Sequence, residues 1–152
     1  MLLVVDANVL FSAIISRSKT CNLMFSERIQ LISPEFLFIE LEEHKDEIIA
    51  KSSLSEDDFN EFVNLLKERI DIIPRQEFER FLQEANKVSP DHDDIPARRA
   101  GRPPAFGLDD TEYLALAMRF DAALWSNDKR LKKQSIIKVF STSDLLSILS
   151  PI

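Results

Sequence analysis

The chain has 152 residues, 45% of them hydrophobic and 30% charged, which suits one globular domain with a real core and is too short for two comfortable ones. A formal net charge of −7 argues against broad, non-specific coating of nucleic acid, and the single cysteine, Cys21, excludes an internal disulfide and favours a reducing compartment. Because no apolar run approaches the roughly 18 to 20 residues of a membrane span and no secretory signal is evident, we expect a cytoplasmic protein without membrane contact.

The first stretch of the chain predicts a buried strand that ends in a carboxylate. Residues 2–5 are all aliphatic with no polar alternation, which is typical of a central strand in a parallel sheet. Asp6 follows at the carboxyl end of this strand, where open α/β sheets place their ligands, and Asn8 follows on the turn into a helix. A buried carboxylate must be paired or bind a metal, although Asp6 or Asn8 could instead simply cap the helix.

The middle of the chain alternates short strands with helices. Ser33 as a cap and Pro34 in the first turn predict the start of one helix, and the capping box beginning at Ser55 predicts the start of another. Helices are expected at 20–28, 35–50, 55–70 and 75–87, with strands at 29–32 and 71–73.

The last third begins with an unusually long irregular segment at 88–108, rich in Pro, Gly, Asp and Arg. A helix at 109–120, strands at 122–125 and 136–140 and a helical turn at 129–133 are expected before a final helix, which a capping box opens at Ser141. We therefore predict a single domain over 1–152 with an irregular insert at about 89–108. Its fold class is α/β, with three α/β/α layers and a small parallel central sheet.

Three further acids occupy positions like that of Asp6. Glu40 is the single acid in an apolar helical run, Asp110 lies in the first turn of a helix that Asp109 can cap, and Asp128 follows a buried strand. Capping is also the simplest alternative for Asp128. If the four acids converge at the carboxyl edge of the sheet, their mutual repulsion implies a bound Mg²⁺ or Mn²⁺.

In this order the motifs resemble those of the PIN-domain nucleases over nearly the whole chain, especially the VapC-like toxins of prokaryotic toxin–antitoxin pairs. The matching stretches are VDAN at 5–8, FIEL at 38–41, DTEYLALA at 110–117 and WSND at 125–128. The resemblance implies a metal-dependent ribonuclease that hydrolyses RNA, with Asp6, Glu40, Asp110 and Asp128 as catalytic residues and metal ligands. It implies supporting roles for Asn8 and Ser126, a homodimer and, for a toxin, a small antitoxin partner.

The chain departs from the family pattern before the third acid. An acidic stretch at 90–96 looks like the usual lead-in, so Asp94 competes with Asp110 for the third place. We expect Asp110, because it is in phase with the apolar helix, whereas Pro96 interrupts any helix starting at Asp94. The arginines of the insert, Arg98, Arg99 and Arg102, either contact RNA phosphates or merely keep a loop soluble.

Other kinds of site fit the sequence less well. The histidines, His44 and His92, are far apart, without zinc-ligand spacing, and both glycines lie in the insert, so no phosphate-cradling loop exists. The stretch after Asp6 lacks the second Asp of the haloacid-dehalogenase phosphatases. A metal-dependent phosphatase, a non-catalytic PIN-like binding module and an RNA-processing nuclease without an antitoxin stay open as alternatives.

Overall fold

Five parallel strands form the central sheet of the computed structural model, which describes residues 1–16, 19–89 and 110–149. The sheet order is β3-β2-β1-β4-β5, and every pairing is parallel. The strands are β1 (Leu2–Val5), β2 (Gln30–Pro34), β3 (Ile70–Ile73), β4 (Ala123–Trp125) and β5 (Val139–Phe140). The predicted parallel α/β fold is confirmed.

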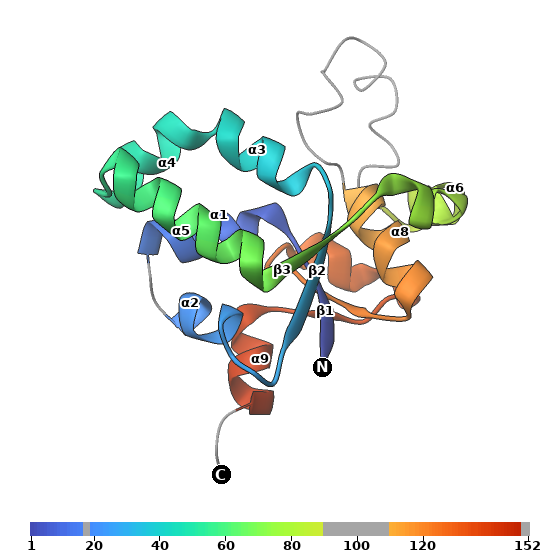
Figure 1. The fold of residues 1–152 in the computed structure, drawn as a ribbon. Helices are drawn as coiled ribbons and strands as arrows, with labels where there is room; N and C mark the ends of the chain where they lie inside the picture. The colour runs from blue at the N-terminus through green and yellow to red at the C-terminus, as the bar shows by residue number, and fades with distance from the viewer. Residues whose placement is uncertain (17–18, 90–109, 150–152) are drawn as a thin grey trace.

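Helices cover both faces of this sheet (Figure 1). One face carries α6 (Leu82–Val88) and α8 (Asp110–Phe120), and the other carries α1 (Ala7–Ser16), α2 (Lys19–Met24) and α5 (Glu56–Arg69). The remaining helices are α3 (Leu37–Glu43), α4 (Lys45–Ser52) and α9 (Thr142–Leu149), with 3₁₀ turns η1 (Arg75–Glu77), η2 (Glu79–Phe81) and η4 (Lys129–Lys133). In the described part of the chain, no helix combines the length and apolar character that crossing a membrane requires.

The strand β1 lies at the centre of the sheet and of the core. Its residues Leu3, Val4 and Val5 are completely buried, as expected for a strand covered by helices on both faces. From β1 the chain first builds outward through β2 and β3, and it later returns to add β4 on the other side of β1. The order therefore reverses between β1 and β4, and open α/β sheets bind their ligands at such a switch point.

The helix predicted to start at Ser33 and Pro34 starts later. Both residues extend β2 and pair with Ile72 and Ile73 of β3, so tertiary pairing overrides the local capping signal. The helix then begins after Phe36, whose side chain makes no capping hydrogen bond. The predicted continuous helix at 35–50 is also interrupted at His44, where φ of −97° and ψ of 11° separate α3 from α4.

Two other predicted elements are shorter than expected. The predicted helix at 75–87 is divided into η1, η2 and α6, and the predicted strand at 136–140 is reduced to β5. The Gln134 side chain explains the second case, because its Oε1 accepts hydrogen bonds from the backbone N–H groups of Ile136 (3.0 Å) and Ile137 (2.8 Å). These local bonds compete with a sheet ladder. Apart from Ser89, the predicted insert at 89–108 lies outside the described residues.

Both serines that were predicted to open a capping box cap their helices, and the reciprocal bond of the box is present at Ser141. The Ser55 hydroxyl accepts the N–H of Asp58 at the start of α5 (3.0 Å). At the start of α9 the exchange is reciprocal: the Ser141 hydroxyl accepts the N–H of Asp144 (3.1 Å), and the Asp144 carboxylate accepts the N–H of Ser141 (2.9 Å). The second box fixes where α9 leaves the sheet after β5.

Replacing the α9 cap, Ser141→Ala, is expected to lower the free energy of unfolding by about 1 kcal/mol, because one backbone N–H loses its acceptor. Urea unfolding followed by circular dichroism measures the change. The exposed neighbour, Ser143→Ala, is the matched control. Equal losses for the two variants would contradict a specific capping role.

Candidate functional site

Asp6 is held in a fixed position at the carboxyl end of β1. The pairing of Val5 with Trp125 continues into a hydrogen bond from the Asp6 N–H to the Trp125 carbonyl (3.2 Å). Its carboxylate Oδ1 accepts the backbone N–H of Asn8 (3.0 Å), and Oδ2 accepts the hydroxyl of Ser126 (2.7 Å). The capping role considered from the sequence therefore coexists with a buried carboxylate whose two oxygens are both oriented.

Burial makes the charged form of Asp6 costly. The side chain is 5% exposed, and this desolvation raises the pKa of Asp6 above its usual value. The hydrogen bonds from Ser126 and Asn8 lower the pKa of Asp6, whereas the nearby carboxylate of Asp128 raises it. The net effect of these influences is a raised pKa, so a neighbouring cation would stabilise the charged carboxylate of Asp6.

The two residues predicted to support the site contribute in different ways. Ser126 is buried, donates to Asp6 and accepts the backbone N–H of Asp128 (3.2 Å), so one hydroxyl connects two of the predicted acids. Asn8 contributes its backbone N–H to Asp6, while its exposed side chain lines the adjoining groove.

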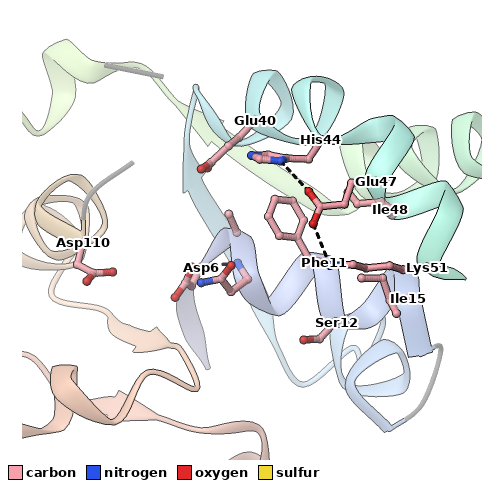
Figure 2. A pocket seen from close by; sticks show the side chains of 12 residues that line it. Asp6, Phe11, Ser12, Ile15, Glu40, His44, Glu47, Ile48, Lys51 and Asp110 are labelled. Atoms are coloured by element: carbon pink, nitrogen blue, oxygen red, sulfur yellow. Dashed lines mark hydrogen bonds and ion pairs between the residues drawn. The ribbon is translucent and has the colours of Figure 1, made fainter. Parts of the chain in front are cut away.

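Three of the four predicted acids face one groove of about 530 Å³. Asp6 comes from the end of β1, Glu40 from the middle of α3 and Asp110 from the first residue of α8, and their carboxylates point into the same end of the groove (Figure 2). Glu40 is 8% exposed, as its apolar sequence neighbours predicted. The competing candidate, Asp94, lies outside the described residues, as does Asp109.

The fourth acid, Asp128, lies beside this groove and is paired with Arg130. The guanidinium Nη2 is 2.8 Å from Asp128 Oδ2 and 3.8 Å from Asp110 Oδ2, so Arg130 bridges two of the four acids. This hydrogen bonding from Arg130 lowers the pKa of Asp128. Asp128 also caps η4 by accepting the N–H of Arg130 (3.0 Å), the alternative role considered from the sequence.

The four acids share one edge of the sheet without forming a tight cluster. Within the residues that the structure describes, no three Asp, Glu, His or Cys side chains approach closely enough to hold one metal ion. Asp6 and Asp128 nevertheless lie near each other, because the Ser126 hydroxyl bonds both the Asp6 carboxylate (2.7 Å) and the backbone N–H of Asp128 (3.2 Å).

The groove is also lined by residues that the sequence analysis did not select as site residues (Figure 2). Phe11 of α1 and His44 meet edge to face, with ring centroids 5.6 Å apart. Beyond them Lys51 pairs with Glu47 (2.8 Å) one turn away on α4, at the i,i+4 spacing that brings opposite charges together on a helix. Phe11 and His44 gave no signal in the sequence, because the break between α3 and α4 decides that they meet.

The sequence analysis also did not identify the hydrogen bonds that hold the end of β4, next to Ser126. The Thr142 hydroxyl accepts hydrogen bonds from the Trp125 indole N–H (3.1 Å) and from the Asn127 amide (3.2 Å). Asn127 Oδ1 in turn accepts the backbone N–H of Thr142 (2.8 Å). The end of β4 is thereby fixed to the start of α9.

The chain is similar to one known sequence family and to solved structures of low sequence identity. The family model that matches is that of the PIN domain, over residues 4–139. A chain in the crystal structure of VapBC2 from Rickettsia felis, bound to a DNA fragment from its promoter, matches with a TM-score of 0.62 and 16% identity, covering 93% of this chain and 98% of that chain. A chain of VapBC-1 from nontypeable Haemophilus influenzae matches with a TM-score of 0.56 and 14% identity, covering 94% and 99%. No curated protein sequence matches.

Replacing Asp6 by Asn is expected to remove a pH-dependent loss of stability from the metal-free protein. Because the folded-state pKa of Asp6 is raised, the wild-type protein loses stability as pH rises from the unfolded-state pKa through the folded-state pKa. The variant avoids this loss, worth about 1.4 kcal/mol for each pH unit between the two pKa values. Urea unfolding in EDTA across a pH series measures the difference in unfolding free energy between the variant and the wild-type protein. The substitution Asp71→Asn at an exposed position controls for the general effect of replacing an acid by an amide. A stability difference that does not grow with rising pH would contradict the prediction.

Replacing Arg130 by Gln is expected to raise the pKa of Asp128 toward its ordinary value, because the guanidinium hydrogen bond is the main cause of its lowering. A carbon-13 NMR titration of the Asp128 carboxyl group measures this pKa directly. Lys129→Gln removes a neighbouring charge without touching the Arg130–Asp128 pair. An unchanged Asp128 titration in the Arg130 variant would show that the pair does not persist in solution.

Proposed function

Because the chain belongs to the PIN domain family, we propose that it is a divalent-metal-dependent endoribonuclease that acts as the toxin of a toxin–antitoxin pair. One observation carries the proposal. The buried and fully oriented carboxylate of Asp6 lies at the switch point of a parallel sheet, and Glu40 and Asp110 face the same end of its groove.

The donor set suits Mg²⁺ or Mn²⁺. All four candidate ligands offer carboxylate oxygens, and Mg²⁺ usually keeps several waters while binding only one or two carboxylates. Widely spaced acids are therefore compatible with an ion held partly through water. In the proposed role Asp6 holds the ion together with Glu40, Asp110 and Asp128, directly or through water. A bound ion of this kind supplies an activated water and stabilises the charge that develops on a phosphodiester.

The residues around the acids would orient the reacting groups. Ser126 and the N–H of Asn8 keep both oxygens of Asp6 in place, which limits reorganisation when a cation arrives. Arg130 is half exposed beside Asp110 and Asp128, and its planar guanidinium suits two oxygens of an RNA phosphate. A local cation of this kind is needed in a chain whose net charge is −7.

The proposed partners are RNA as substrate, a small antitoxin protein and a second copy of the chain. Both solved structures described above are VapBC assemblies, and one is bound to promoter DNA. Their folds match this chain over almost its whole length, which supports the toxin role in preference to an RNA-processing nuclease without an antitoxin.

The non-catalytic alternative draws on one observation, the pairing of Arg130 with two of the four acids. If that pairing is permanent, the chain is a PIN-like binding module. Adding Mn²⁺ to the metal-free protein separates the two, because a ligand that binds only the folded state raises Tm. A module of this kind would show no rise.

Cleavage of a fluorescent RNA in the presence of Mn²⁺ tests the proposed reaction. Asp6→Asn and Asp128→Asn are each expected to lower the rate by about 100-fold or more, because they remove proposed metal ligands. The exposed substitution Glu61→Gln on α5 is the matched control. Far-UV circular dichroism and the Tm of each variant, compared with the wild-type protein, separate a loss of activity from a loss of folding. Wild-type rates in both Asp variants would overturn the proposal.

A further inference from the structure

The 3₁₀ turn η4 carries a large share of the positive charge of this acidic chain. Residues 129–138 contain five of the 19 basic residues and no Asp or Glu, whereas the chain as a whole has a formal net charge of −7. A local positive surface therefore exists despite the negative total. We call the four cations of η4 the cationic turn: Lys129, Arg130, Lys132 and Lys133.

The buried side chain of Leu131 fixes which way these cations face. Leu131 is completely buried, so the rest of η4 points to solvent, and all four cations are exposed. A 3₁₀ helix has three residues per turn, which places residues 129 and 132 along one line of its surface and residues 130 and 133 along another. On the second line, Arg130 and Lys133 are separated by a rise of about 6 Å, which is comparable with the separation of neighbouring phosphates along an RNA strand.

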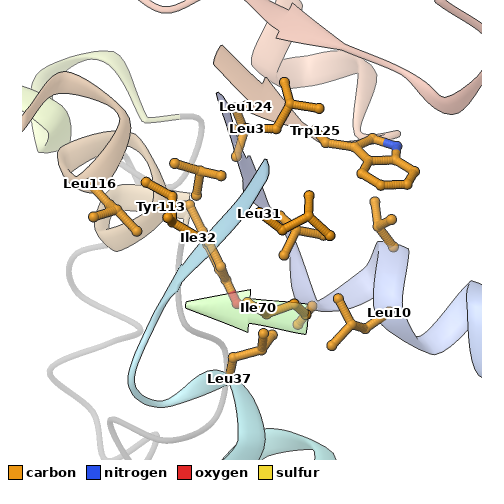
Figure 3. Packing of buried hydrophobic residues seen from close by; sticks show 14 of the residues in the cluster. Leu3, Leu10, Leu31, Ile32, Leu37, Ile70, Tyr113, Leu116, Leu124 and Trp125 are labelled. Carbon is orange, nitrogen blue, oxygen red and sulfur yellow. The ribbon is translucent and has the colours of Figure 1, made fainter. Parts of the chain in front are cut away.

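Contacts at both ends hold the cationic turn in place. At its start, the Asp128 carboxylate accepts the N–H of Arg130 (3.0 Å). The strand that precedes it, β4, is anchored by the completely buried side chain of Trp125 (Figure 3). At its end, the Gln134 side-chain amide donates a hydrogen bond to the carbonyl of Leu131 (3.0 Å). A surface that is already ordered loses less conformational entropy when a ligand binds.

Two lysines of the cationic turn are available to an external anion. Arg130 pairs with acids beside the groove, and Lys132 pairs with Asp144 of α9. In the part of the chain that the structure describes, no Asp or Glu carboxylate pairs with Lys129 or Lys133. The positive charge of these two lysines is therefore not neutralised within the fold.

We propose that the cationic turn binds the phosphate backbone of single-stranded RNA where the strand leaves the groove. Arg130 Nη2 lies 3.8 Å from the carboxylate of Asp110, which lines the groove, so a strand in the groove passes directly onto the turn. Arg130 and Lys133 take neighbouring phosphates, and Lys129 adds attraction from the other side of the turn. Such contacts supply affinity and orient the strand without reading its sequence. The inference deepens the function proposed above and rests on it, because it takes RNA as the substrate.

Binding of a fluorescent oligouridine in EDTA tests this surface without metal ions or cleavage. The test variant is the double substitution Lys129→Gln and Lys133→Gln. For each lysine lost, the steepness of log K against log salt is expected to fall by about 0.7, and affinity is expected to fall about fivefold at roughly 0.1 M salt. The matching pair Lys129→Arg and Lys133→Arg keeps both charges and is expected to bind within about twofold of the wild-type protein.

Lys67→Gln on α5 is the matched control. It removes one charge from an exposed lysine on a helix that leads into β3, at the opposite edge of the sheet from β5. Its oligouridine affinity is expected to stay within about twofold of the wild-type value, because distant exposed charges are screened.

The outcomes separate this inference from the proposed reaction. Wild-type RNA affinity in the double Gln variant, as expected if the turn serves an acidic protein partner, overturns the inference. An equal loss in Lys67→Gln, or a loss seen only with duplex DNA, overturns it as well. A wild-type protein that binds no oligouridine also overturns it. Cleavage by the Asp6 and Asp128 variants decides the nuclease proposal independently, because the binding assay involves no cleavage.

Discussion

The parallel pairing of β1 with β4 is the constraint on which the rest of the site depends. It brings Asp6 and Ser126, which are 120 positions apart in the chain, within a 2.7 Å hydrogen bond of each other. The backbone hydrogen bond from the Asp6 N–H to the Trp125 carbonyl keeps the ends of β1 and β4 in register. Hydrogen bonds between Thr142 and Asn127 fix the end of β4 to the start of α9. A carboxylate is thereby placed in a buried position that its own sequence neighbours could not hold.

The electrostatics of the site follow from this placement. Asp6 and Asp128 are joined through the Ser126 hydroxyl, yet burial raises the pKa of Asp6 whereas Arg130 lowers the pKa of Asp128. Two carboxylates at one edge of a sheet are thus held in different electrostatic states by their surroundings, a pattern common at functional sites. The guanidinium of Arg130 offsets part of the repulsion between Asp110 and Asp128, where a divalent ion could also act.

One group in the site lowers the stability of the metal-free fold. Asp6 has its carboxylate in a buried position, where desolvation disfavours the charged form. This cost is local, because the buried residues of β1 that precede Asp6 are all apolar. Proteins commonly accept such costs where the unfavourable group serves a ligand, since the same feature that destabilises the empty fold favours the bound one.

The sequence by itself determined the parallel α/β class, the strand that ends at Asp6 and the serine caps of α5 and α9, because these depend on residues within a few positions of one another. It also selected two acids that line the groove, Glu40 as the single acid of an apolar helical run and Asp110 as an acid in the first turn of an apolar helix. Only the tertiary structure decided that Ser33 and Pro34 extend β2, because their pairing partners lie in β3. It likewise decided that His44 meets Phe11 and that Arg130 reaches Asp110, since such contacts arise from the way distant elements pack.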